Sequence, residues 1–470
     1  MFMLIFDSSK KQKVEFVSIV PNVVRIYVCG PTVYDNAHLG HARSAIAFDL
    51  LQRILEANGY EVIFVKNFTD IDDKIVKKSK EADKSVDEIT ATYTQSYLND
   101  MESLGIRRPT LEPKATQNLE AIFKMIKTLL KNKKAYIAKN GDIYMKVKED
   151  SKYGTLSNRI NLESQISRIG ENEFKEDIRD FALWKIFNKA DDVAYDSEFG
   201  RGRPGWHIEC SSMIEEHLAY KDKDYSIDIH AGGADLLFPH HENEASQSRC
   251  ANNKELAKYW IHNGFVNVNG EKMSKSLGNS YFIKDALKIY DGEILRYYLL
   301  SMHYRAPINF SHNDIIQNKK RLDRLYRLKK RLNVEYNENI LDTAFRDEFL
   351  GALNDDMNIS IALSILDSMI SNYNDLLDKN PKDLATKQKA ISNIIFINQL
   401  LGIGEKDPIE YFHLGVDSDT KAYIEKKIKE RKIARENKDY ALSDRIRDEL
   451  KAKNISLMDT KDGVVWEYSE

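Results

Sequence analysis

The chain has 470 residues, of which 42% are hydrophobic and 30% charged, so we expect a large enzyme with several compact domains. Its formal net charge of −3 excludes indiscriminate binding of polyanions and leaves room for local basic patches. The opening segment MFMLIFDSSKKQKVEF lacks the core of a signal peptide. No later stretch approaches the roughly 20 apolar residues of a membrane span, so we expect a cytoplasmic protein.

Strand-like and helical patterns alternate near the start of the chain. The apolar runs VRIYVCG (24–30) and EVIFVKNF (61–68) predict strands. Between them, SAIAFDLLQRILEANG (44–59) places its apolar residues on one helical face and ends at Gly59, where a left-handed cap is favoured. This order predicts a parallel βαβ unit at the beginning of an open α/β sheet.

The rest of the chain falls into patterns of different kinds. The middle is irregular, with GDIYMKV (141–147) strand-like, whereas long charged helical periods follow further on. The end of the chain predicts two helices and a strand-like tail. We therefore expect residues 1–115 and 201–310 to form the two halves of the sheet domain, 116–200 an insertion, 311–405 a helical bundle and 406–470 a small terminal module.

Two motifs suggest a nucleotide site. His38, Gly40 and His41 stand at the entry of the first predicted helix, where unpaired N–H groups favour phosphate and both imidazoles can donate to it. In EKMSKSLGNS, Lys272 and Lys275 can neutralise a departing pyrophosphate. Alone, the first motif is more often structural and the second a solvated loop. In this order they resemble the two signatures of class I aminoacyl-tRNA synthetases, which implies a doubly wound, Rossmann-like sheet that binds ATP.

Four further residues form a candidate metal set. Cys29 ends the first strand, Cys210 lies in RPGWHIECSSM, and His240 and Glu244 in FPHHENEAS share one face if that segment is helical. Two thiols, an imidazole and a carboxylate suit tetrahedral zinc. Two buried thiols and a helix-capping pair would give the same pattern. Cys250 fits no ligand spacing, and we expect an ordinary thiol.

Sequence blocks along the whole chain carry a closer resemblance. PTVYDNAHLGHARS, NFTDIDDKI, RPGWHIECS, GGADLLFPHHENE and EKMSKSLGN resemble, in order, those of bacterial cysteinyl-tRNA synthetases, and ARENKDYALSDRIRDEL resembles the anticodon-side module of that family. The resemblance implies that L-cysteine is activated with ATP and Mg²⁺ and transferred to the 3′ end of tRNA(Cys). It also implies that Cys29, Cys210, His240 and Glu244 hold one zinc ion that binds the substrate thiolate. We expect a monomer.

The amino-acid pocket and the tRNA surface are predicted from weaker signals. Thr69, with its neighbour Asp70, follows a strand where an α-amino group can bind, while Trp206 and His230 lie close in sequence to the metal set. The stretch 319–331 carries eight basic residues against the single acid Asp323, which favours phosphate tracking. The basic run 426–435 and Trp466, as a stacking surface, are the candidates for contact with tRNA in the terminal module.

Two other functions remain to be weighed. Ligases that join activated cysteine to an amino sugar resemble the catalytic core but lack the anticodon-side module, so the C-terminal residues favour tRNA. A catalytically silent RNA-binding relative is disfavoured, because the two histidines, the two lysines and all four metal positions are intact.

Overall fold

The computed structural model describes residues 2–159, 174–187, 193–268, 270–273, 281–338, 340–460 and 463–468. Contacts between residues divide the chain into two compact units. The first contains residues 1–284, 299–311 and 348–363, and the second contains 285–298, 312–347 and 364–470. Among the described residues, no helix combines the length and the apolar character that crossing a membrane requires.

Four parallel strands form the central sheet of the first unit. Their order is β10-β9-β3-β4, where β3 is Val23–Val28, β4 is Glu61–Lys66, β9 is Tyr225–Gly233 and β10 is Glu255–Asn263. The strands β4 and β9 flank β3 on opposite sides, so the direction of winding reverses at β3. Such a switch point opens a crevice at the carboxyl ends of the strands, and this crevice is where open α/β sheets bind ligands.

Helix α1 (Leu39–Ala57) connects β3 to the parallel strand β4, which confirms the predicted βαβ unit. It buries Leu51 and Ile54 completely. Gly59 follows the C-cap with φ +86°, in the left-handed region that favours glycine. An antiparallel hairpin of β1 (Leu4–Asp7) and β2 (Gln12–Glu15) precedes the sheet, and helices α2 (Asp73–Ala82) and α3 (Val86–Ser103) follow β4.

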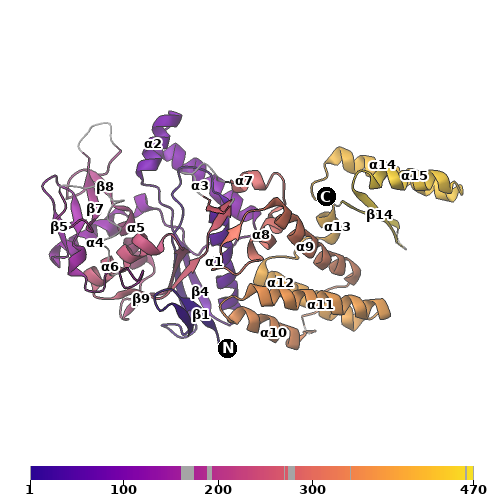
Figure 1. Ribbon diagram of the computed structural model, residues 1–470, viewed down its shortest axis with the longest axis horizontal. Helices are drawn as coiled ribbons and strands as arrows, with labels where there is room; N and C mark the ends of the chain where they lie inside the picture. The colour runs from indigo at the N-terminus through magenta and orange to yellow at the C-terminus, as the bar shows by residue number, and fades with distance from the viewer. Residues whose placement is uncertain are drawn as a thin grey trace. The chain divides into compact units, whose positions relative to one another are not determined.

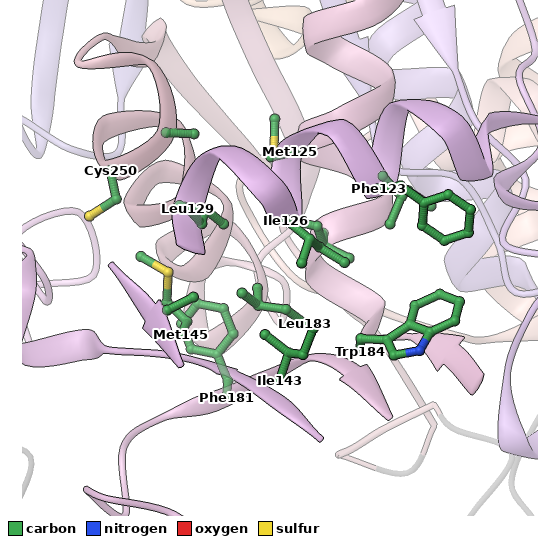
Figure 2. Close-up of a cluster of buried hydrophobic side chains, with 14 of the residues drawn as sticks. Phe123, Met125, Ile126, Leu129, Ile143, Met145, Phe181, Leu183, Trp184 and Cys250 are labelled. Carbon is green, nitrogen blue, oxygen red and sulfur yellow. The ribbon is translucent and has the colours of Figure 1, made fainter. Parts of the chain in front are cut away.

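A second sheet, which is antiparallel throughout, is formed by residues that lie between β4 and β9 along the chain. It contains β5 (Ala135–Ile137), β6 (Ile143–Met145), β7 (Phe181–Ile186) and β8 (Gly202–Pro204), and α4 (Leu119–Lys131) precedes it. Figure 2 shows Ile126 and Leu129 of α4 packed toward Ile143 and Leu183 of the strands, with Cys250 at the edge of the cluster. Cys250 is thus a thiol of an apolar core, as expected.

The second half of the sheet domain supplies two helices that contact the strands of the central sheet. Helix α5 (Trp206–His217) precedes β9, and a kinked turn η5 (Leu237–His241), extended at Phe238 with φ −143° and ψ 132°, leads into α6 (Glu242–Asn252), which precedes β10. The helices α4 and α5 lie beside the strands of the antiparallel sheet (Figure 1). A small sheet of β11 (Val266–Val268), β12 (Glu271–Lys272) and β13 (Ile308–Asn309) follows.

The second unit is largely helical, as the charged helical periods predict. Its elements, some shared with the first unit, are α7 (Ile283–Ala286), α8 (Gly292–Leu300), α9 (His312–Leu332), α10 (Thr343–Asn354), α11 (Ile359–Lys379), α12 (Leu384–Leu401), α13 (Pro408–Phe412), α14 (Ser418–Glu436), α15 (Tyr440–Lys451), and the hairpin β14 (Ile455–Thr460) and β15 (Gly463–Tyr468). The predicted pair of terminal helices with a strand-like tail is present as α14, α15 and this hairpin.

Candidate metal centre and nucleotide site

Four potential metal ligands from three segments of the chain meet at the carboxyl end of β3. Cys29 follows β3 directly, Cys210 projects from α5, and His240 and Glu244 stand one helical turn apart across η5 and α6. One ligand atom from each lies within 4.8 Å of all the others. The two sulfur atoms are 3.9 Å apart, and Glu244 Oε1 is 3.6 Å from the sulfur of Cys29. The structure therefore brings together the four residues that the sequence proposes as a metal set.

The geometry of this cluster fits a tetrahedral zinc ion. With Zn–S bonds of about 2.3 Å, two thiolates on a tetrahedral ion lie about 3.8 Å apart, close to the observed 3.9 Å. His240 Nε2 is buried without a hydrogen bond, although Glu244 Oε1 is 2.9 Å away. This nitrogen and this oxygen are close together but do not point at each other. Two ligands that both point at a common ion have this arrangement.

A second set of potential ligands overlaps the first. Cys29, His230, His241 and Glu244 also present atoms within 4.8 Å of one another. In this set His230 Nε2 is already bonded to Glu244 Oε2 at 2.9 Å. The first set offers two soft sulfur ligands and an imidazole nitrogen without another partner, so it suits zinc better.

Neighbouring rings hold the ligands in place. His207 Nδ1 lies 2.8 Å from Nδ1 of His240, and the ring of Trp206 stacks on His240 with centroids 4.1 Å apart. His230 bonds the second oxygen of Glu244. Contacts of this kind fix the orientation and tautomer of metal ligands. Trp206 is 41% exposed, so it stands as a wall beside His240 and not as a core residue.

Burial and neighbouring charges set the protonation of these groups. Burial alone would raise the pKa of Glu244, but His230 and His240 lower it to about 2. A hydrogen bond from Cys29 lowers the pKa of Cys210 to about 6. Burial, with His240, lowers the pKa of His207 to about 3. Near neutral pH, Glu244 is therefore ionised and Cys210 is largely a thiolate. Burial raises the pKa of Cys29. Burial alone would lower the pKa of His240, but Glu244 with Cys210 outweighs it and raises this pKa to about 10. Cys29 and His240 therefore release a proton when a metal binds.

A row of buried histidines behind the cluster was not predicted. His241 Nε2 lies 3.5 Å from the sulfur of Cys29, and its Nδ1 is 2.8 Å from His262 Nε2 on β10. His262 Nδ1 in turn lies 2.8 Å from the hydroxyl of Ser8. Burial lowers the pKa of His262 to about 3. The sequence signal was present in the second histidine of FPHHENE, but nothing in that motif identifies its partner on β10.

The predicted phosphate-binding residues form the N-terminus of α1. His38 Nδ1 accepts from the backbone N–H of Gly40, and His41 Nδ1 accepts from that of His38, both at 3.1 Å. With Nδ1 as acceptor, a neutral ring carries its proton on Nε2, which is the tautomer that can donate to a phosphate oxygen. A Cβ at Gly40 would lie 2.8 Å from the ring of His38, so glycine is needed for this arrangement.

The second nucleotide motif is described in part. Lys272 ends β12 and only its backbone is described, and Lys275 lies outside the described residues. The chain that follows is attached to the first motif: the Leu39 N–H donates to the Tyr281 carbonyl at 3.0 Å, and the Ile283 N–H donates to the Ala37 carbonyl at 2.9 Å. The backbone thus joins the stretch after the second motif to the residues that flank His38.

The residues predicted to bind the amino group of the substrate have the following contacts in the structure. Thr69 is buried, and its backbone pairs with Pro31 and Val33 in the segment that follows Cys29. The two oxygens of Asp70 accept from the backbone N–H and the hydroxyl of Thr116 at 2.9 and 2.5 Å. Glu209, which sequence reasoning missed, is the buried carboxyl group that bonds Thr69 instead.

Two features predicted for the tRNA surface have partners within the protein. Trp466 is 5% exposed and stacks on His413 with centroids 3.6 Å apart, so its ring is not a surface for stacking bases. The basic stretch of α9 is mostly neutralised within the second unit. Its partners are Asp323 for Lys319, Asp367 for Arg321 and Arg324, Glu467 for Arg327 and Lys330, three backbone carbonyls for Lys329, and Asp378 for Arg331.

Comparison with known proteins identifies the class. Residues 15–320, more than half of the chain, match the family described as tRNA synthetases class I (C) catalytic domain. The fold resembles that of Mycobacterium tuberculosis methionyl-tRNA synthetase in complex with methionyl-adenylate, with a TM-score of 0.61 over 86% of this chain and 96% of that chain. At 13% identity this likeness concerns the fold alone. The parallel sheet, the capped helix and the matching family together define a class I aminoacyl-tRNA synthetase.

Relatives of nearly the same length identify the amino acid. The cysteine–tRNA ligase of Helicobacter hepaticus is 56% identical over 98% of this chain and 99% of its own. Those of Aliarcobacter butzleri and a Nitratiruptor species are 57% identical, covering 98% and 99% of this chain and 98% and 100% of their own. The chain belongs to the cysteine–tRNA ligase family, as the resemblance of its sequence blocks predicts, and so it is an ATP-dependent ligase that acts on cysteine and tRNA.

Proposed function

We propose that the cluster of Cys29, Cys210, His240 and Glu244 holds one zinc ion and that the thiolate of L-cysteine binds there. The observation that carries the proposal is the convergence of four ligand atoms within 4.8 Å of one another, with the two sulfur atoms 3.9 Å apart, at the switch point of the sheet. When bound, zinc supplies a Lewis acid that favours a thiolate over the hydroxyl of serine. Discrimination by direct bonding to the metal requires no hydrolytic correction of near-isosteres.

The residues of the chain then position the reacting groups. Trp206 covers one side of His240, and Thr69 lies beside the segment that follows Cys29. His38 and His41, with Nε2 protonated, and Lys275 are proposed to stabilise the triphosphate and its associated Mg²⁺ as the cysteine carboxylate displaces pyrophosphate. Because that carboxylate is already a nucleophile, this step needs alignment and neutralisation of charge more than a general base. The terminal ribose of tRNA(Cys) then receives the cysteinyl group.

The cellular setting follows from the same assignment. Three unpaired cysteines suit a reducing compartment, and supply of aminoacylated tRNA(Cys) suits the cytoplasm, where we propose that the protein acts as a monomer.

Two cysteine substitutions test the metal assignment. We expect Cys210→Ser to lose most of its zinc and its cysteine-dependent pyrophosphate exchange, because one thiolate ligand is missing. Cys250→Ala, which changes a buried thiol in the apolar cluster, should retain both. Metal content by mass spectrometry and exchange measured with cysteine and with serine, before and after chelation, provide the readouts. Full zinc occupancy in Cys210→Ser would refute the ligand set.

A further inference from the structure

Glu209 is a buried carboxyl group without a counter-charge. It lies on α5 directly before Cys210 and is 1% exposed. Its Oε2 atom is buried and has no hydrogen-bond partner. Within the part of the chain that the structure describes, no lysine, arginine or histidine lies at ion-pair distance from it. An unpaired buried carboxyl group is costly, and such a group in a folded protein calls for a physical explanation.

The surroundings of Glu209 tie it to the proposed cysteine pocket. The hydroxyl of Thr69 is its hydrogen-bond partner. Thr69 is fixed by its backbone, whose N–H donates to the carbonyl of Pro31 and whose carbonyl accepts from the N–H of Val33, both at 3.1 Å. The amide of Asn67 also reaches Thr69 Oγ1, at 3.4 Å. Glu209 is thus held between a metal ligand on α5 and the segment that follows the metal ligand Cys29.

The electrostatic environment of Glu209 is negative. Burial raises the pKa of the Glu209 carboxyl group, and the nearby Cys210, Asp70 and Asp72 raise it further. Each oxygen of Asp70 already accepts a hydrogen bond from Thr116, whereas Oε2 of Glu209 accepts none. A positively charged group is therefore what this position lacks, and the unpartnered oxygen of Glu209 is the acceptor available for it.

We propose that Oε2 of Glu209 receives the α-ammonium group of the cysteine substrate, with Thr69 holding the carboxyl group in position. The inference rests on the proposed function, because it requires the substrate sulfur to bind at the four-residue cluster. Sulfur and nitrogen are separated by two carbon atoms in cysteine. Once the thiolate is at the cluster, the ammonium group lies beside it, next to the residue that precedes Cys210. An ammonium donor would pair the buried oxygen and stabilise the ionised form of the carboxyl group.

The test removes first the ammonium group of the ligand and then the carboxyl group of Glu209. Binding of L-cysteine and of 3-mercaptopropionate, which lacks the ammonium group, is measured by titration calorimetry with the zinc-loaded full chain. The wild-type protein should bind cysteine about 10 to 100 times more tightly than 3-mercaptopropionate, as expected for a hydrogen bond between charged groups. In Glu209→Gln this preference should fall to a few-fold. The affinity for 3-mercaptopropionate should stay within a few-fold of the wild type.

Other outcomes distinguish the ways in which the idea can fail. An unchanged preference for cysteine in Glu209→Gln, or an equal loss of both ligands, overturns the role of Glu209. If neither thiol binds the zinc-loaded wild type, the proposed function itself fails. Glu215→Gln is the matched control, because Glu215 lies on the same helix but pairs with Lys221 at 2.9 Å; it should leave both affinities unchanged. Should Glu209→Gln not fold, Thr69→Val should reduce the preference in the same direction, and an unaltered preference there also refutes the proposal.

Discussion

Gly30 shows how one residue sets the position of a proposed metal ligand. A Cβ added there would lie 1.5 Å from the carbonyl oxygen of Asn67, so the ends of β3 and β4 meet at the backbone. The Gly30 N–H also donates to Asn67 Oδ1 at 2.8 Å. Cys29 precedes this contact by one residue, so any displacement of Gly30 moves the sulfur that faces Cys210.

We predict that Gly30→Ala destabilises the protein by about 3 kcal/mol and lowers its zinc content, because the added methyl group has to displace backbone. Gly351→Ala is the opposite case, since Gly351 lies in α10 with open space around its Cβ position. It should raise the stability by roughly 0.5 to 1 kcal/mol. Urea unfolding and metal analysis of both variants check the prediction. Equal effects of the two alanines would contradict it.

For single residues, the sequence indicated which side chains carry functional groups, but it did not indicate their hydrogen-bond partners. Residue type and order made Cys29 and Cys210 candidate ligands but left buried thiols open, and the resemblance of the sequence blocks to a known family selected the metal set. The sequence could not show that Asp70 accepts hydrogen bonds from Thr116 while Oε2 of Glu209 has no partner. Such contacts depend on how segments far apart in the chain pack together.

The basic residues of helix α9 also have partners that the sequence did not indicate. Its density of basic residues suggested a phosphate-binding surface, but Asp367 of α11 accepts from both Arg321 and Arg324. A basic run in sequence has two possible partners, nucleic acid or a neighbouring acidic helix, and the sequence does not contain the packing that decides between them. By contrast, Lys429 and Lys432 of α14 are exposed and take part in no described ion pair.

We predict that the two helices respond differently to loss of charge. Lys429→Gln with Lys432→Gln should lower the dependence of charging on salt, by about one unit of slope for each phosphate that is no longer neutralised. Arg321→Gln with Arg324→Gln should leave that slope nearly unchanged and instead reduce the stability by about 1 kcal/mol, as is typical for partly exposed ion pairs. Aminoacylation at limiting tRNA over a range of salt concentrations, with urea unfolding, separates the two effects. A larger slope change from the α9 pair would restore α9 as the tRNA surface.

For the whole molecule, sequence patterns predicted helices and strands better than they predicted how these elements are grouped into compact units. The alternation of strands and helix indicated the parallel sheet, because a buried parallel strand and an amphipathic helix have distinct periodicities. The antiparallel sheet of the insertion was largely missed, since β5 and β6 have three residues each and show no period. The two compact units interleave along the chain, whereas the five segments predicted from sequence follow chain order.

This grouping places every proposed zinc ligand in the first unit. A ligand that binds the folded state stabilises the part of the structure that supplies its contacts, by an amount that grows with its affinity and concentration. We therefore predict that chelation of zinc increases amide hydrogen exchange at the end of β3, in α5 and in α6, where the four ligands lie. Exchange in α12 and α14 of the second unit should change little.

Hydrogen exchange measured by mass spectrometry on the full chain, before and after chelation and after zinc is added back, tests this expectation. Cys210→Ser provides the control, because a chain that has already lost a ligand should show little further response to the chelator. If α12 and α14 lose protection as strongly as α5 and α6, the metal stabilises both units together. In that case the two compact units unfold as one cooperative structure, and the local account of the metal centre is wrong.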